Sequence, residues 1–147
     1  MPTILSRRWP ATAASLPAAR HATIDTLTQA GVKNRQLLTT IALAVSEAFG
    51  NAVRHAYPTA AGDVEVTVEH HLGEITVTVS DTGVGINHGT HNPGLGLGLQ
   101  LMDALTKRWT IGSDSVGTTI TLVFDSDPAR PSPEHSPDVH GQPETPI

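Results

Sequence analysis

The sequence predicts an α+β fold: a two-layer α/β sandwich with a mostly antiparallel mixed sheet and its helices on one face. Two kinds of apolar pattern lead to this prediction, because some segments repeat with the helical period and others alternate apolar with polar residues. The expected order is strand, helix, helix, strand, strand, loop, helix, strand, strand. Strands that follow one another directly pair most simply as hairpins, which leaves the helices to gather on one face of the sheet.

The first two expected elements are a short strand and a helix. Residues 3–9 alternate loosely between polar and apolar types, which predicts an edge strand. We expect Ser15 to cap a helix in which Pro17 is tolerated, because the first turn needs no N–H there. This helix should run to about Ala30 and stop at Gly31.

A longer helix is expected to begin near Asn34. Its apolar residues recur at spacings of three and four: Leu38, Ile41, Val45, Phe49, Ala52 and Ala56. The Tyr57-Pro58 pair should end it, because a residue that precedes proline avoids the helical conformation.

Strands account for most of the remaining pattern. Residues 64–68 and 75–79 each alternate valine or isoleucine with polar residues, and 70–73 can join them as a hairpin. Two further strands are expected at 108–111 and 118–124, linked through the turn residues Gly112-Ser113-Asp114.

Between these two pairs of strands, residues 81–98 are rich in Gly, Asn, His and Thr and predict a long loop. Loops of this length inside compact domains tend to be lids or binding loops. A helix from Leu97 to about Lys107 should follow it.

The composition changes after Asp125, which divides the chain into a domain at 1–125 and a tail at 126–147. Six of the eleven prolines lie between Pro128 and Pro146. Such a segment cannot bury enough apolar surface to offset the entropy lost on ordering, so we expect a disordered tail.

Overall composition excludes several classes of protein. No cysteine is present, which rules out disulfides and thiolate chemistry. The formal net charge is -5 with nine Lys and Arg, and without a basic stripe direct nucleic-acid binding is not expected. No apolar run approaches the ~18 residues of a membrane span, and the N-terminus lacks a signal-peptide core. We expect a cytoplasmic protein.

Glu47 and Asn51 are four residues apart on the second helix, so their side chains lie on the same face. An ionised glutamate can accept a proton from a hydroxyl or a water molecule. The asparagine carbonyl is a hard oxygen that suits Mg²⁺. A merely solvated polar face would present the same two residues, so this spacing alone decides nothing.

Asp81 ends a valine-rich strand and is followed by Gly83 and Gly85. Because an ionised aspartate only accepts hydrogen bonds, it can pair with the amino group of adenine. Guanine carries a carbonyl at that position and would be rejected. An ordinary Asp-Thr-Gly turn is the alternative.

Gly94, Gly96 and Gly98 precede a predicted helix, where backbone N–H groups can approach phosphate. The spacing is not that of a Rossmann fingerprint, because Leu99 occupies the position of its third glycine, and no Gly-Lys-Ser/Thr element of a P-loop is present. A glycine hinge remains possible. His88 and His91 in the predicted loop have no nearby Asp, Glu or Cys at metal-ligand spacing, so a histidine metal site is not expected.

Together these motifs resemble the superfamily of gyrase, heat-shock chaperone, histidine kinase and MutL ATPases (GHKL). Residues 44–57 resemble its N box, 81–85 and 94–99 its two glycine boxes, and 117–119 its terminal Gly-Thr element. The similarity covers about residues 10–124 and is closest to bacterial anti-sigma-factor serine/threonine kinases.

This resemblance implies a Bergerat-type fold that binds ATP and Mg²⁺. Glu47 would be the general base and Asn51 the Mg²⁺ ligand, while Asp81 would bind the adenine amino group with support from Thr118. The expected pocket and lid glycines are Gly83, Gly85, Gly94, Gly96 and Gly98. Arg54 departs from the pattern, since many relatives carry another polar residue there, and the lid lacks a basic residue near phosphate.

The resemblance also implies partners. Members of this kinase class phosphorylate a serine on a STAS-type anti-anti-sigma protein and sequester a sigma factor, usually as homodimers. Residues 16–20 are similar to a stretch that the family uses for partner contact, which makes Arg20 a candidate contact residue. The expected function is therefore that of an ATP-dependent anti-sigma-factor serine/threonine protein kinase.

A second interpretation stays open: a nucleotide-dependent protein that sequesters a sigma factor or another regulator without phosphorylating it. A complete sensor histidine kinase is not expected, because the residues before the second helix leave no room for a phosphoacceptor hairpin. A catalytic fragment that acts on a separate histidine protein also remains open.

Overall fold

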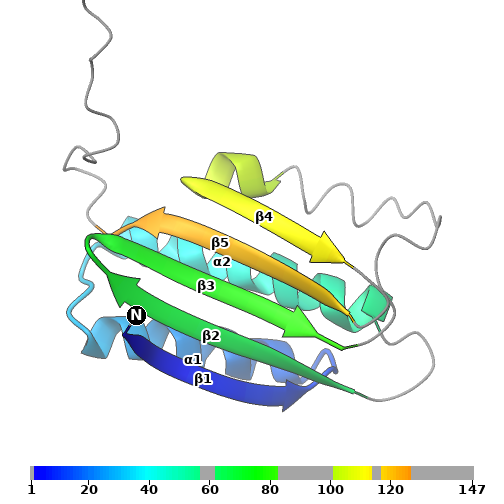
Figure 1. The fold of residues 1–147 in the computed structure, drawn as a ribbon. Coiled ribbons are helices and arrows are strands. Elements are labelled where there is room, and N and C mark those ends of the chain that lie inside the picture. The colour runs from blue at the N-terminus through cyan, green and yellow to red at the C-terminus, as the bar shows by residue number, and fades with distance from the viewer. Residues whose placement is uncertain (1, 57–61, 83–100, 114–116, 127–147) are drawn as a thin grey trace, which may run out of the picture.

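The computed structural model describes residues 2–56, 62–82, 101–113 and 117–126, which form a sheet with helices against one face (Figure 1). The elements are β1 (Thr3–Pro10), α1 (Ser15–Gln29), α2 (Arg35–Asn51), the π-helix η1 (Ala52–Ala56), β2 (Asp63–His71), β3 (Glu74–Asp81), β4 (Arg108–Ser113) and β5 (Thr118–Asp125). Residues 101–105 are also helical, in agreement with the second half of the predicted helix 97–107.

The five described strands are ordered β1-β2-β3-β5-β4. All four pairings are antiparallel, so the described sheet is purely antiparallel rather than mixed. The strand order places β1 at one edge, where the sequence predicts an edge strand. The predicted α+β sandwich is confirmed.

The core lies between the sheet and the two long helices. Alternating valine and isoleucine residues of β2 and β3 face the helices and are at most 2% exposed: Val64, Val66, Val68, Ile75, Val77 and Val79. From α2, Ile41, Val45 and Phe49 are fully buried against this surface. The alternating and helical patterns of the sequence therefore meet at one apolar interface, as predicted.

The starts of the two long helices agree with the sequence with one correction. Asn34 caps α2, since its Oδ1 accepts a hydrogen bond from the Leu37 N–H at 2.9 Å. Ser15, however, is not the cap of α1, because the N-cap is Ala14 and makes no side-chain bond. Thr12, three residues before Ser15, accepts the Ser15 N–H at 3.3 Å and so takes the capping role.

The end of α2 also differs from the prediction of an uninterrupted α-helix. The α-helix stops at Asn51 and continues as the π-helix η1. The spacing of Ala52 and Ala56 fits an α-helix equally well, so the apolar pattern cannot reveal the wider turn. Single π turns are rare and often occur at functional sites.

The predicted hairpin between β2 and β3 is confirmed, but its loop has two residues instead of the four predicted at 70–73, because His70 and His71 belong to β2. His71 pairs with Glu74, which leaves Leu72 and Gly73 as the loop. Their φ angles are +52° and +81°, and a loop with two positive φ angles matches the twist of the flanking strands.

β4 is longer than predicted, because Gly112 and Ser113 belong to the strand instead of a turn. Gly112 pairs with Thr119 and Ser113 with Thr118. Ladder pairing with β5 evidently outweighs the turn preference of these two residues. Of the loop predicted at 81–98, Asp81 belongs to β3 instead, and residues 83–98 lie outside the described residues, as does the tail after Ser126.

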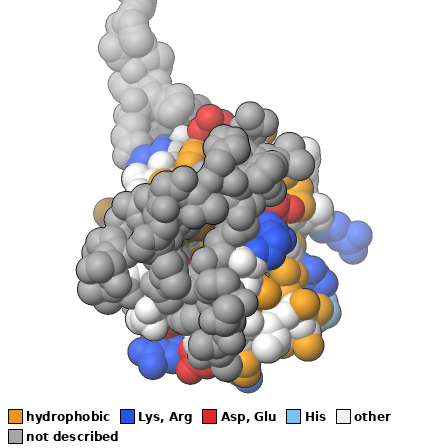
Figure 2. Space-filling model, turned by 90° about the vertical axis from the view of Figure 1, so that its right-hand side faces the viewer, with side chains coloured by type: hydrophobic (Ala, Val, Ile, Leu, Met, Phe, Trp, Pro, Cys, Tyr) orange, Lys and Arg blue, Asp and Glu red, His pale blue; other side chains and the backbone are white. Residues whose placement is uncertain are grey.

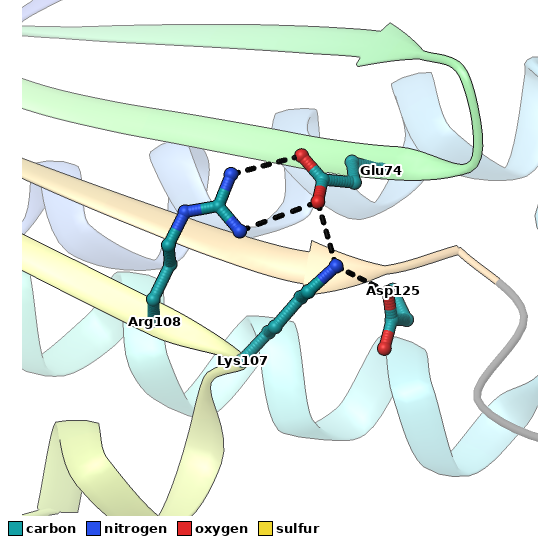
Figure 3. Close-up of polar contacts among 4 residues, drawn as sticks. All are labelled: Glu74, Lys107, Arg108 and Asp125. Atoms are coloured by element: carbon teal, nitrogen blue, oxygen red, sulfur yellow. Dashed lines mark hydrogen bonds and ion pairs between the residues drawn. The ribbon is translucent and has the colours of Figure 1, made fainter. Parts of the chain in front are cut away.

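A cluster of four charged residues joins the strands at one end of the sheet (Figure 3). Lys107 Nζ lies 2.7 Å from Glu74 Oε2 and 3.2 Å from Asp125 Oδ1, and Arg108 Nη2 lies 3.1 Å from Glu74 Oε1. The hydrogen bond from Lys107, followed by that from Arg108, holds the pKa of Glu74 below its ordinary value, although partial burial opposes them.

Candidate nucleotide-binding site

The opposite end of the sheet gathers most of the described residues that the motifs single out. Glu74 pairs with Asp125 at the charged end, whereas Asp81 pairs with Thr118 at the other end. Figure 1 shows that α2 also ends there, and η1 contacts β3. The fold therefore brings the end of the Glu47–Asn51 helix toward the strand ends that carry Asp81 and Thr118.

Asn51 has the most informative environment in this region. Its side chain is buried, with 2% of the residue exposed. Its Oδ1 accepts a hydrogen bond from Arg54 Nη2 at 3.1 Å, while its Nδ2 has no hydrogen-bond partner among the described residues. An unpaired buried amide group costs about 1–3 kcal/mol, so this position favours a ligand over a purely structural role.

Arg54 is the residue of this site that the sequence did not assign to it. The side chain folds back along the helix, so that a Cβ added at Gly50 would lie 3.2 Å from Arg54 Nη1. The spacing of three residues from Asn51 is the signal that could have indicated the contact, since residues at this spacing are neighbours on a helix.

Glu47 lies one turn before Asn51 on α2 and is partly buried. A residue four positions earlier presents its side chain on the same face of the helix. The helix thus offers a carboxylate and a buried amide side by side, as the motif predicts. This combination can accept a proton and ligate a cation.

Asp81 and Thr118 are opposed in the sheet and are 7% and 4% exposed. Gly117 precedes Thr118 and approaches the backbone of β3 closely. A Cβ at Gly117 would lie 2.0 Å from the Asp81 carbonyl oxygen and 2.7 Å from the Thr82 Cα. Only a glycine allows β5 to begin this near Asp81, which gives the Gly-Thr element a structural reason.

Arg20 connects the two long helices beside the candidate base. Its Nη1 donates a hydrogen bond to Ser46 Oγ at 3.3 Å, and Ser46 Oγ donates to the Ala42 carbonyl at 2.8 Å. Ser46 directly precedes Glu47. Arg20, the predicted partner-contact residue, is therefore hydrogen-bonded to the residue next to Glu47, the predicted base.

The predicted pocket and lid glycines lie outside the described residues: Gly83, Gly85, Gly94, Gly96 and Gly98. Their roles remain predictions. Figure 2 faces the end of the molecule at which α2 and β3 end, and its described part shows Lys and Arg side chains beside hydrophobic ones.

The described donors fit a magnesium ion that arrives with a nucleotide. No group of three or more His, Cys, Asp or Glu that could hold a metal is found in the described ranges. Asn51 offers one buried amide oxygen, and Glu47 lies one turn away. Mg²⁺ commonly takes only one or two protein oxygens and completes its shell with water and phosphates, so this sparse donor set suits it.

The described part of the chain contains no helix that is both long and apolar enough to span a membrane.

Comparison with known families gives a match over most of the chain. Residues 9–124 match the family described as the histidine kinase-like ATPase domain, and the protein belongs to that family. The match includes both strand ends and the helix of the candidate site, and an ATPase domain of this kind binds ATP.

Among individual relatives, the chain is similar to the serine-protein kinase RsbW of Bacillus mycoides (strain KBAB4). The two are 32% identical over 128 residues, which covers 73% of this chain and 79% of that protein.

Two solved structures share the fold. The RsbU and RsbW domains of Rv1364c from Mycobacterium tuberculosis match with a TM-score of 0.63 and 25% identity, covering 82% of this chain and 32% of that one. The histidine kinase domain of a blue-light activated kinase from Erythrobacter litoralis EL346 matches with a TM-score of 0.55 and 25% identity, covering 76% and 59%. The chain thus spans less than two thirds of either structure.

Proposed function

We propose that this protein is an ATP-dependent serine/threonine protein kinase of the anti-sigma-factor class. The observation that supports the proposal is the placement of the buried Asn51 amide one helical turn after Glu47, on the helix that ends near Asp81 and Thr118. Similarity to a protein named serine-protein kinase RsbW favours serine or threonine over histidine as the acceptor.

Each described residue of the site has a role in this proposal. The Asp81 carboxylate accepts a hydrogen bond from the adenine amino group, and Thr118 supports that contact from the opposing strand. Asn51 Oδ1 holds Mg²⁺, which offsets negative charge on the phosphates when it is bound. The pocket glycines bring backbone N–H groups near those phosphates.

Glu47 acts on the acceptor rather than on the nucleotide. Its carboxylate orients the serine hydroxyl of the partner and takes the hydroxyl proton as the oxygen attacks. Phosphoryl transfer depends mainly on positioning and charge stabilisation, so a single carboxylate at the acceptor is sufficient chemistry for the chain to supply.

The proposal includes two protein partners and a cellular setting. The acceptor serine belongs to a STAS-type anti-anti-sigma protein, and a sigma factor is the regulator that the kinase sequesters. Arg20, tied to Ser46 beside Glu47, contacts the partner. We further propose that the protein acts in the cytoplasm as a homodimer.

The test separates transfer from binding. Glu47→Ala should reduce phosphorylation of the acceptor by at least about 100-fold, the usual contribution of a general base, and leave ATP affinity nearly unchanged. Phosphate transfer is measured with labelled ATP and an acceptor recovered by pull-down, and affinity by calorimetry. Glu69→Gln, a change on β2 outside the site, serves as the control.

A folded Glu47→Ala protein that loses ATP affinity together with activity would contradict the assigned role. A wild-type protein that forms a stable complex with its partner but transfers no label would favour the alternative function, regulator sequestration without phosphorylation.

A further inference from the structure

The hydrogen bond between Arg54 and Asn51 identifies the atom that faces the guanidinium. Arginine carries only donors, so the Asn51 atom 3.1 Å from Nη2 is the amide oxygen. This is the oxygen that the proposed function assigns to Mg²⁺. In the structure, therefore, a side chain of the protein itself occupies the position from which a cation would be held.

A guanidinium and a divalent cation at the same oxygen repel each other, because both are positively charged. A Mg–O bond is about 2.1 Å long, so a cation on Oδ1 would lie within about 5 Å of Nη2 if Arg54 stayed in place. The site is partly shielded from water by the burial of Asn51, which strengthens the repulsion between the two positive charges. This repulsion favours release of the Arg54 side chain when the cation binds.

Three features show that the local structure accommodates this contact. The absence of a side chain at Gly50 leaves room for the guanidinium, since an added Cβ would lie 3.2 Å from Nη1. Arg54 itself is exposed, so the side chain can swing outward without unpacking the core. It also belongs to the π-helix η1, a kind of turn that often marks functional sites.

Arg54 also fixes how the Asn51 amide is oriented. Nδ2 has no partner among the described residues, so the hydrogen bond from Arg54 to Oδ1 is the contact that holds the carboxamide in one rotamer. The amide oxygen, and not the nitrogen, therefore faces the guanidinium.

We infer that the Arg54 side chain takes the place of the metal in the metal-free protein. It orients the Asn51 oxygen through its hydrogen bond and is displaced when the metal–nucleotide complex binds. The inference rests on the proposed nucleotide site and adds a positioning residue to it. Its consequence is that the metal competes with Arg54, whereas the nucleotide without metal does not need to displace it.

Calorimetry with a non-hydrolysable ATP analogue tests this competition. For each protein, the dissociation constant is measured once with excess Mg²⁺ and once with EDTA, and their ratio gives the enhancement of affinity by the metal. Arg54→Met keeps the length of the side chain but removes the charge and the donors. The enhancement should be at least about tenfold larger in this variant than in the wild type, the lower end of the value of one hydrogen bond to a charged group.

The ratio is the useful quantity because any contact of Arg54 with the nucleotide affects both buffers similarly. Arg35→Met, at the start of α2, is the matched control and should show the wild-type ratio. A second readout needs no variant: the side-chain resonances of Arg54 in labelled wild-type protein should shift with Mg²⁺ and the analogue together but not with the analogue in EDTA.

The outcomes separate this inference from the proposed function. The displacement of Arg54 by the metal would be refuted by equal enhancement in the wild type and Arg54→Met, or by Arg54 resonances that respond equally in both buffers. Neither result would contradict nucleotide binding itself. A wild-type protein that binds no nucleotide in either buffer would overturn the proposed function and this inference together.

Discussion

Gly117 decides how closely β5 begins beside Asp81. A Cβ at this position would lie 2.0 Å from the Asp81 carbonyl oxygen and 2.8 Å from its carbonyl carbon. These are backbone atoms of a paired strand, and unlike the end of a flexible side chain they cannot move aside alone. The position of the proposed adenine-binding carboxylate is therefore coupled to one glycine on the next strand.

Gly117→Ala should displace Asp81 and weaken ATP binding by at least about tenfold, with a stability loss of about 1–3 kcal/mol typical of overpacking. Nucleotide titration and denaturant unfolding measure the two effects. Gly112→Ala on β4 is the matched control, since a Cβ there meets nothing within 4 Å. Similar small effects of both substitutions would show that the close approach does not constrain the site.

At this scale the sequence predicted Glu47, Asn51, Asp81 and Thr118 as site residues because each belongs to a motif of fixed spacing. The roles of these residues stay predictions, while the structure supplies their placement. The contact of Arg54 with Asn51 could not be predicted, because it depends on which way a long side chain folds over Gly50. Sequence spacing restricts neighbours but does not select rotamers.

The β2–β3 hairpin shows what can be predicted at the scale of elements. Strict alternation in both strands predicts the hairpin, which the structure confirms with a shorter loop. The pattern does not show that Leu72 adopts a left-handed conformation, with φ +52° and 86% of the residue exposed. A leucine in this conformation costs roughly 1–2 kcal/mol because of its Cβ.

Replacing Leu72 by Asn should therefore stabilise the protein by about 0.5–1 kcal/mol, because Asn tolerates the left-handed region better. The free energy of unfolding from urea denaturation is the measurement. The same replacement at Leu43, an exposed leucine in α2, should not stabilise, since that residue has helical geometry. Destabilisation by Leu72→Asn would mean that the turn is held by contacts of the leucine itself.

The π-helix η1 shows what the sequence pattern cannot predict at the scale of elements. The apolar period runs through Ala52 and Ala56 without interruption, so a sequence pattern predicts a continuous α-helix. The helix type changes after Asn51, where η1 also contacts β3. Neither this change nor this contact can be predicted from the apolar period alone.

For the whole molecule, the charged cluster and the candidate site lie at opposite ends of the sheet. Glu74, Lys107, Arg108 and Asp125 tie the start of β3, the end of β5 and the start of β4 together (Figure 3). Hydrophobic patterning predicts the layers of the fold, but these pairings depend on the strand order β3-β5-β4, which no local pattern encodes.

This cluster should make stability depend on acid pH. The pKa of Glu74 is lower in the folded than in the unfolded state, chiefly because Lys107 donates a hydrogen bond to it. Its contribution is fully present above the unfolded pKa, about 4.3, and is lost as the pH falls through the lower folded value. Glu74→Gln should cost about 1 kcal/mol at pH 7, and this difference from the wild type should shrink below about pH 4.

Denaturant unfolding from pH 7 to pH 3 provides the comparison, with Glu69→Gln on β2 as a control outside the cluster. A difference between Glu74→Gln and the wild type that stays constant over this range would show that the charge of Glu74 is not the source of the stability.

The central claim is that the end of the sheet near Asp81 binds adenine nucleotides, and calorimetry with ATP and GTP in excess Mg²⁺ tests it most directly. Wild-type protein should bind ATP and strongly prefer it to GTP, because the Asp81 carboxylate accepts from the adenine amino group and faces a carbonyl in guanine. Asp81→Asn should reduce that preference by at least about tenfold, the effect of about 1.4 kcal/mol. A folded protein that binds neither nucleotide, or binds both equally, would contradict the account.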